Sequence, residues 1–88
     1  MTLQTIRILY FARLREAFDL DGEVLALPPG CADVAGLLAL LRARGGAWAA
    51  ELAEGRVFRV AVEQDMARHD TALAAGAEVA IFPPVTGG

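Results

Sequence analysis

One segment of this sequence constrains the fold more than any other, because it has the periodicity of a helix long enough to cover a sheet. Its apolar residues recur at i, i+3, i+4 and i+7, which places them along one helical face; they are Val34, Leu37, Leu38 and Leu41. Asp33 can cap the first turn, and Gly45-Gly46 can end the helix in a left-handed conformation. A helix with one apolar face must bury it against another element.

That element is a sheet, because alternating β-branched and aromatic segments stand on both sides of the helix. Minor elements are a helical turn over 14–18, a short helix from Trp48 that stops at Gly55 and a short edge strand around Met66. The order β-β-α-β-β predicts an α+β fold, a mixed four- to five-stranded sheet with one main helix on one face. Residues 1–82 form the domain and residues 83–88 an extended tail. The predicted strands are 5–11, 23–27, 57–62 and 78–82.

The two faces of the predicted sheet differ in composition. One set is almost entirely apolar and is expected under the helix: Ile6, Ile8, Tyr10, Phe58, Val60, Val62, Val79 and Ile81. The opposite set mixes large apolar groups with guanidinium groups: Arg7, Leu9, Arg59 and Phe82. Aromatic residues and Arg are enriched at protein interfaces, which favours a partner-binding surface. An ordinary half-polar sheet surface is the alternative.

Composition excludes several classes of function. The chain has no Ser, Lys or Asn, which removes a Ser nucleophile, a Schiff-base Lys and a P-loop. Cys31 and His69 are each alone, so one chain cannot supply a zinc site or an iron–sulfur cluster from them. A net charge of −3 argues against a nucleic-acid partner. The lone Cys and the lack of a stretch of roughly 20 apolar residues predict a cytoplasmic protein without a membrane partner.

Candidates for self-contained catalysis are few. Cys31 lies just before the main helix, where a helix N-terminus can lower a thiol pKa, but a lone Cys is far more often a small apolar residue. His69 reads as a surface loop residue. The carboxylates of Glu63, Asp65 and Asp70 have the spacing of solvated turn residues.

The C-terminal run has the features of a carrier. Pro83 and Pro84 end the last strand and hold the exit direction stiff, and the six residues after Phe82 can reach at most about 20 Å. Gly87 and Gly88 lack Cβ, so the tip can enter a narrow tunnel. A carboxylate reacts only after activation, for example as an acyl-adenylate, and can then become a thioester or a thiocarboxylate. The expected working group is therefore the terminal carboxylate of Gly88, presented to a partner's active site by Pro83, Pro84, Val85 and Thr86.

The sequence resembles the family of molybdopterin synthase small subunits, which are ubiquitin-like sulfur carriers. The resemblance is most specific in the terminal run E-V-A-I-F-P-P-V-T-G-G. It extends to Y-F-A-R-L-R-E at residues 10–16 and to the Trp48 segment that leads into Gly55, so it spans nearly the whole chain. Two departures fall in turns: Glu63 stands where the family often has Asn, and Ala75 and Ala77 stand where it often has acidic residues.

This resemblance implies a β-grasp fold and a reaction sequence. An E1-like enzyme would adenylate Gly88 with ATP, and a sulfur donor protein would convert it to a thiocarboxylate. That sulfur would pass to cyclic pyranopterin monophosphate, forming the dithiolene of molybdopterin. The tail would insert into a large subunit that holds the catalytic Lys, within a heterotetramer. Phe82 would be part of the docking surface, and this chain would bind no permanent cofactor or metal.

Two other functions remain open. Related carriers that serve thiamine, cysteine or tRNA thiolation share the Gly-Gly end, although P-P-V-T-G-G and the Trp48 segment favour molybdopterin. A protein modifier or interaction module would instead join Gly88 to a Lys of its target. Because this chain has no Lys, it cannot build polymers on itself but can still modify other proteins.

Overall fold

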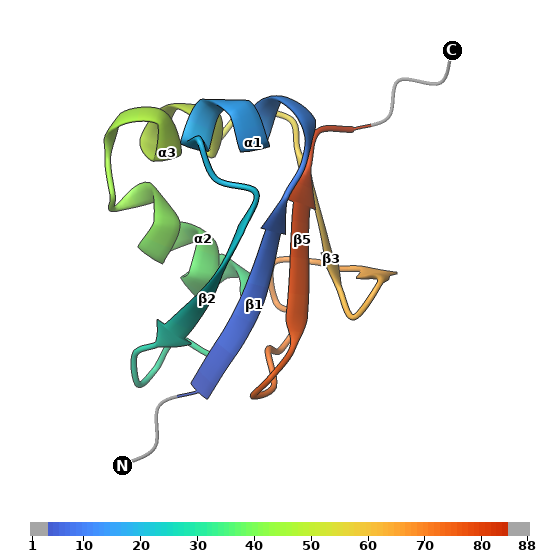
Figure 1. The fold of residues 1–88 in the computed structure, drawn as a ribbon. Helices are drawn as coiled ribbons and strands as arrows, with labels where there is room; N and C mark the ends of the chain where they lie inside the picture. The colour runs from blue at the N-terminus through green and yellow to red at the C-terminus, as the bar shows by residue number, and fades with distance from the viewer. Residues whose placement is uncertain (1–3, 85–88) are drawn as a thin grey trace.

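The computed structural model describes residues 4–84, which form a five-stranded sheet and three helices (Figure 1). The strands are β1 Gln4–Tyr10, β2 Gly22–Leu27, β3 Arg59–Val62, β4 Asp65–Met66 and β5 Glu78–Phe82. The helices are α1 Ala12–Phe18, α2 Val34–Arg42 and α3 Gly46–Glu51. The predicted α+β class and the mixed sheet with one main helix are therefore confirmed.

The order of the strands puts the last one near the middle of the sheet. It reads β2-β1-β5-β3-β4, with β5 parallel to β1 and antiparallel to β3. The pairs β1–β2 and β3–β4 are both antiparallel. Strand β5 is thus hydrogen-bonded on both sides, and the chain that follows it starts from a well-held position.

The core forms between the apolar stripe of α2 and the apolar face of the sheet. All four residues of the helical stripe are at most 2% exposed, and Asp33 caps α2 by accepting a hydrogen bond from the Gly36 amide at 2.8 Å. The expected inner face of the sheet is buried at six of its eight positions: Ile6, Ile8, Tyr10, Val60, Val79 and Ile81. Phe58 and Val62 are only half-buried; Phe58 precedes β3 and contributes to the side of a groove instead.

Element boundaries differ from the predicted ones for local reasons. Strand β1 ends at Tyr10, because Phe11 serves as the residue before α1 and its amide bonds to the Ile81 carbonyl. Strand β3 begins at Arg59 rather than at residue 57. The predicted left-handed ending of the main helix at Gly45-Gly46 is wrong, because α2 ends at Arg42 and its C-cap Ala43 is right-handed, with φ of −64°. Gly45 and Gly46, with φ of 77° and 53°, instead start α3, where Gly45 is the N-cap.

An aromatic cluster with a polar edge joins β1, β2 and α3. The rings of Phe18 and Trp48 stack at 3.8 Å, and Tyr10 meets both edge-to-face at 5.1 and 5.3 Å. The Tyr10 hydroxyl donates to Glu23 Oε2 at 2.7 Å, and Arg44 donates to both Glu23 oxygens at 2.8 Å. The Arg44 guanidinium also lies 4.4 Å from the Trp48 ring centre, so one side chain links an ion pair with a cation–π contact.

Candidate functional site: the base of the tail and the outer sheet face

The tail leaves the domain from the end of β5. Ile81 is paired with Tyr10 on one side and with Val60 on the other, and Phe82 is paired with Arg59. Pro83 and Pro84 follow and are half-buried. The other predicted tail residues, Val85, Thr86, Gly87 and Gly88, lie outside the described residues. The structure thus gives the tail a base with little freedom up to Pro84, where proline fixes φ.

Helices α1 and α3 pack together at the end of the sheet from which the tail leaves (Figure 1). Their link is polar: Glu51 Oε1 accepts from Arg13 Nε and from Arg56, each at 3.0 Å. Arg13 also donates to the Val57 carbonyl at 3.2 Å, which ties α1 to the segment entering β3. The Arg13 hydrogen bond is the main reason that the pKa of Glu51 lies below its ordinary value.

The four residues predicted to bind a partner lie on one face of the sheet, which we call the outer face: Arg7, Leu9, Arg59 and Phe82. The register shows this directly, since Arg59 stands opposite Phe82 and Leu9 opposite Ala80, two positions before Phe82. Arg7 and Arg59 are exposed, whereas Leu9 and Phe82 are half-buried. The structure brings these residues together; their binding role stays a prediction.

Sequence analysis missed three apolar residues around that face. Val24 is 69% exposed and stands opposite Arg7, and Met66 is 64% exposed and stands opposite Ala61. Phe11 is 45% exposed beside the end of β5. The alternation of β1 already placed Phe11 on the side of Arg7 and Leu9, so that residue had a signal. Val24 and Met66 join the face only through strand pairing, which the local sequence does not specify.

Cys31 lies far from the tail. It follows β2, whose last residue Leu27 is paired with Gln4 at the start of β1, whereas β5 meets the far end of β1 at Tyr10. Burial, and to a lesser degree the Asp33 charge, raises the pKa of the Cys31 thiol. A thiol with a raised pKa forms less of the nucleophilic thiolate at neutral pH. The structure therefore favours the apolar role for this residue.

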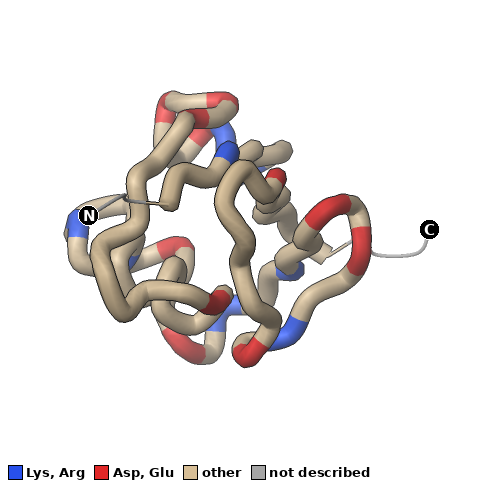
Figure 2. Tube along the Cα trace, turned by 90° about the horizontal axis from the view of Figure 1, so that it is seen from below, with Lys and Arg blue, Asp and Glu red and all other residues tan. Residues whose placement is uncertain are grey.

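The remaining polar candidates are dispersed. His69, Glu63, Asp65 and Asp70 are exposed, and Glu63 accepts a hydrogen bond from the Glu78 amide at 2.6 Å. Within residues 4–84, no three His, Cys, Asp or Glu side chains are grouped so that they could hold a metal ion. Basic and acidic residues are interspersed along this part of the trace (Figure 2). None of its helices has the length and hydropathy needed to span a membrane.

Comparison with known proteins places this architecture in a family. The ThiS family model matches residues 8–88. The molybdopterin synthase sulfur carrier subunit of Escherichia coli (strain K12) is 40% identical over 84 residues, covering 94% of this chain and 99% of the relative. The Haemophilus influenzae subunit of the same name is 34% identical, with the same coverage. Among solved structures, SAMP1 from Haloferax volcanii has a TM-score of 0.78 at 28% identity, covering 96% of this chain and 99% of that one. The fold is the ubiquitin-like β-grasp, and the chain belongs to the ThiS family.

Proposed function

We propose that this protein is the sulfur carrier subunit of a molybdopterin synthase and carries sulfur on the C-terminal carbonyl of Gly88. The main observation in support of this proposal is the direct connection between β5 and the tail. The central strand runs without interruption into Pro83-Pro84, and the sequence then ends in Val-Thr-Gly-Gly. Relatives with this name match over nearly the whole chain.

The chemistry begins with an activating enzyme that holds ATP. A Gly88 carboxylate oxygen attacks the α-phosphorus of ATP, pyrophosphate leaves, and an acyl-adenylate forms. A sulfur donor protein then delivers sulfur at the oxidation level of sulfide, which attacks the Gly88 carbonyl and displaces AMP, leaving a thiocarboxylate at Gly88. That sulfur then bonds to cyclic pyranopterin monophosphate, and water cleaves the bond between sulfur and the Gly88 carbonyl, which supplies the oxygen that restores the carboxylate. This chain contributes the activated end group, and the catalytic Lys belongs to the large subunit.

The outer face supplies a docking surface for the large subunit and the activating enzyme. Phe82 and Leu9 give it half-buried apolar area, and Arg7 and Arg59 give it charge, a composition that interfaces favour. Phe11 extends this apolar area toward the base of the tail, and Val24 and Met66 extend it sideways onto β2 and β4. A partner seated here receives the tail along a defined direction. A heterotetramer with two large subunits and a cytoplasmic location belong to the same proposal.

Intact mass spectrometry tests the proposal directly. The protein is incubated with its activating enzyme, ATP and a sulfur source, and the expected product is heavier by the difference between one sulfur and one oxygen atom. Omission of ATP is the control. If the added sulfur is found on Cys31 after proteolysis, or if no sulfur is gained, the carrier role of Gly88 is wrong.

One observation favours a second function, protein modification. SAMP1, the small archaeal modifier protein 1, has nearly the same fold at 28% identity. In that role the adenylated Gly88 carbonyl would be attacked by a target Lys amine and would form an isopeptide bond, with AMP as the leaving group. Conjugates of higher mass with a Gly88–Lys linkage, formed in place of the thiocarboxylate, would support the modifier.

A further inference from the structure

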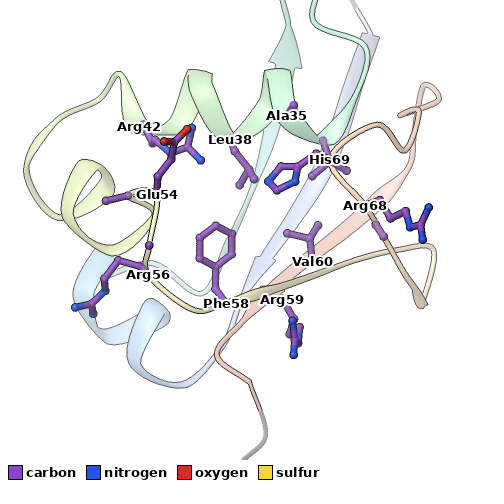
Figure 3. A pocket seen from close by; sticks show the side chains of 14 residues that line it. Ala35, Leu38, Arg42, Glu54, Arg56, Phe58, Arg59, Val60, Arg68 and His69 are labelled. Carbon is purple, nitrogen blue, oxygen red and sulfur yellow. The ribbon is translucent and has the colours of Figure 1, made fainter.

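A groove lies on the other side of β3 from the outer face. It has a volume of about 540 Å³ and runs between α2 and the segment 53–60, with the loop 67–69 closing one end (Figure 3). Its apolar lining comes from both walls: Val34, Leu38, Phe58 and Val60. The Phe58 ring packs against the core but is only half-buried and faces the groove (Figure 3), so part of its aromatic surface is available to a ligand.

The charges around this groove are mostly of one sign. Four of the eight Arg residues of the chain line it, against a single carboxylate, that of Glu54. This excess of positive charge stands out in a molecule whose net charge is −3. The four cations are Arg42, Arg56, Arg59 and Arg68.

Two of these cations are already engaged, and two are available. Arg42 Nε donates to the Leu52 carbonyl at 2.6 Å, and Arg56 is paired with Glu51. Arg59 and Arg68 are exposed and form no ion pair within residues 4–84. Both extend outward from the edge of the groove (Figure 3). An apolar floor with unneutralised guanidinium groups at its edge suits a ligand that is apolar at its centre and acidic at its ends.

We propose that this groove docks an acidic peptide segment of a partner protein, with one apolar side chain on Phe58 and carboxylates beside Arg59 and Arg68. A small inorganic anion would not use the apolar floor, which offers it no polar partner. A peptide uses both features, because an apolar anchor supplies affinity and charged flanks supply orientation.

The groove also lies close to the working end of the molecule. Arg59 borders it and stands opposite Phe82, the last residue of β5. A segment bound in the groove would therefore approach the base of the tail. Because Arg59 also belongs to the outer face, such a segment would share this one guanidinium with a partner on that face and leave Arg7, Leu9 and Phe82 free. This inference does not depend on which acceptor receives the sulfur.

Peptide display on the full chain tests the proposal. A library of random 12-residue peptides is selected against the immobilised protein, and the enriched peptides are expected to carry an aromatic or aliphatic residue flanked by Asp and Glu. Arg68→Glu should weaken their binding about tenfold, which corresponds to roughly 1.4 kcal/mol. Arg15→Glu is the matched control, because Arg15 is exposed on α1 and does not line the groove; binding should change little.

Amide shift mapping by NMR gives a second readout that does not require a variant. The largest shifts on adding an enriched peptide should fall on Leu38, Phe58 and His69. The proposal is overturned if no peptide is enriched, if the enriched peptides lack acidic residues, or if the shifts centre on Val24 and Arg7. It is also overturned if Arg68→Glu and Arg15→Glu behave alike, or if a single-stranded RNA oligonucleotide displaces the peptide from the groove.

Discussion

Phe82 is where the sheet, the tail and the outer face meet. Its backbone completes the pairing with β3, and its side chain points away from the core. Ile81, one position earlier, is fully buried on the opposite face. If Phe82 has its predicted docking role, these adjacent residues of one strand separate two contributions that are usually mixed at an interface, namely partner affinity and folding stability.

Truncation of Phe82 should affect binding rather than folding. Phe82→Ala is expected to weaken association with the large subunit by about 2–4 kcal/mol, as loss of an aromatic anchor does, with the melting temperature nearly unchanged. Ile81→Ala is the control and should lower stability by about 2–5 kcal/mol through loss of core packing. Titration calorimetry and thermal melts of both variants measure the two effects. If Phe82→Ala melts early and binds normally, the assignment of the faces is wrong.

Removal of the lone thiol should leave sulfur transfer intact. Cys31→Ala is expected to form the thiocarboxylate at the rate of the unchanged protein, because the thiol has a raised pKa and lies at the opposite end of β1 from the tail. Intact mass spectrometry over time measures the rate. A folded Cys31→Ala variant that gains no sulfur would instead indicate a persulfide carrier.

At the scale of elements, the turn of the β3–β4 hairpin contains residue types that are unusual for its backbone conformation. Glu63 and Gln64 connect the two strands with φ of 52° and 70°, a conformation that costs an ordinary residue roughly 1–2 kcal/mol and favours Asn or Gly. The Glu63 carboxylate offsets part of this cost through its hydrogen bond to the Glu78 amide. Gln64 side-chain atoms make no hydrogen bond within residues 4–84.

The two turn positions should therefore respond differently to glycine. Gln64→Gly is expected to stabilise the protein by about 0.5–1 kcal/mol, since relief of the left-handed strain exceeds the added backbone entropy of the unfolded chain. Glu63→Gly removes the same strain but also the bond to Glu78, so its gain should be smaller or absent. Chemical denaturation of the two variants side by side gives the comparison. Equal stabilisation by both would show that the Glu63 bond contributes nothing.

The Tyr10–Glu23–Arg44 network predicts a pH-dependent stability. Hydrogen bonding from Arg44 is the main reason that the pKa of Glu23 is lowered from 4.5. Because the folded pKa lies below the unfolded one, the ionised carboxylate stabilises the fold above about pH 4.5, and this stabilisation is lost as the pH falls through the folded value. Glu23→Gln should then cost about 1–2 kcal/mol at neutral pH, the size of lost charge-assisted hydrogen bonds.

Urea unfolding of Glu23→Gln and the unchanged protein from pH 7 down to pH 3 tests this expectation. The difference in free energy of unfolding should be constant near neutral pH and should shrink below about pH 4.5. The Tyr10 hydroxyl stays protonated over this range, because burial raises its pKa further above the ordinary value. A difference that does not depend on pH would show that the Glu23 charge is not the source of the stabilisation.

For the whole molecule, the predicted division into a domain and a tail implies a variant that folds but cannot carry sulfur. Addition of one Ala after Gly88 should abolish thiocarboxylate formation and sulfur transfer, because in the proposed reaction the activating enzyme acts on a free glycine carboxylate. The melting temperature should stay the same, since the addition lies beyond the sheet. Activity that persists in the extended protein, confirmed by mass to be untrimmed, would contradict a reaction at Gly88.

Sequence periodicity predicted the buried faces of helices and strands, because these depend on the spacing of residues close together in the chain. The stripe from Val34 to Leu41 follows from helical spacing and was confirmed in full, and the buried set around Ile8 follows from strand alternation and was confirmed at six of its eight positions. Long-range pairs were not predictable in this way: Arg13 reaches Glu51 across 38 positions, and Arg44 reaches Glu23 across 21. The groove between α2 and residues 53–60 likewise exists only after the chain has packed. The prediction that Gly88 is the reactive residue comes from the tail sequence and from the family resemblance. The structure adds the placement of Pro83 and Pro84 at the base of the tail.

Because β5 lies at the centre of the sheet, the sheet can be completed only after this late part of the sequence has been synthesised. Within residues 4–84, the strand pairs β1–β2 and β3–β4 are hydrogen-bonded to each other only through β5, which follows the other four strands in the sequence. Until β5 has been made and released, the two strand pairs therefore have no hydrogen-bonded connection to each other within the sheet. Prematurely terminated chains that lack β5 cannot close the sheet and expose its apolar face to proteases and chaperones. A chain can therefore complete its sheet only if it includes β5, the strand that precedes the tail.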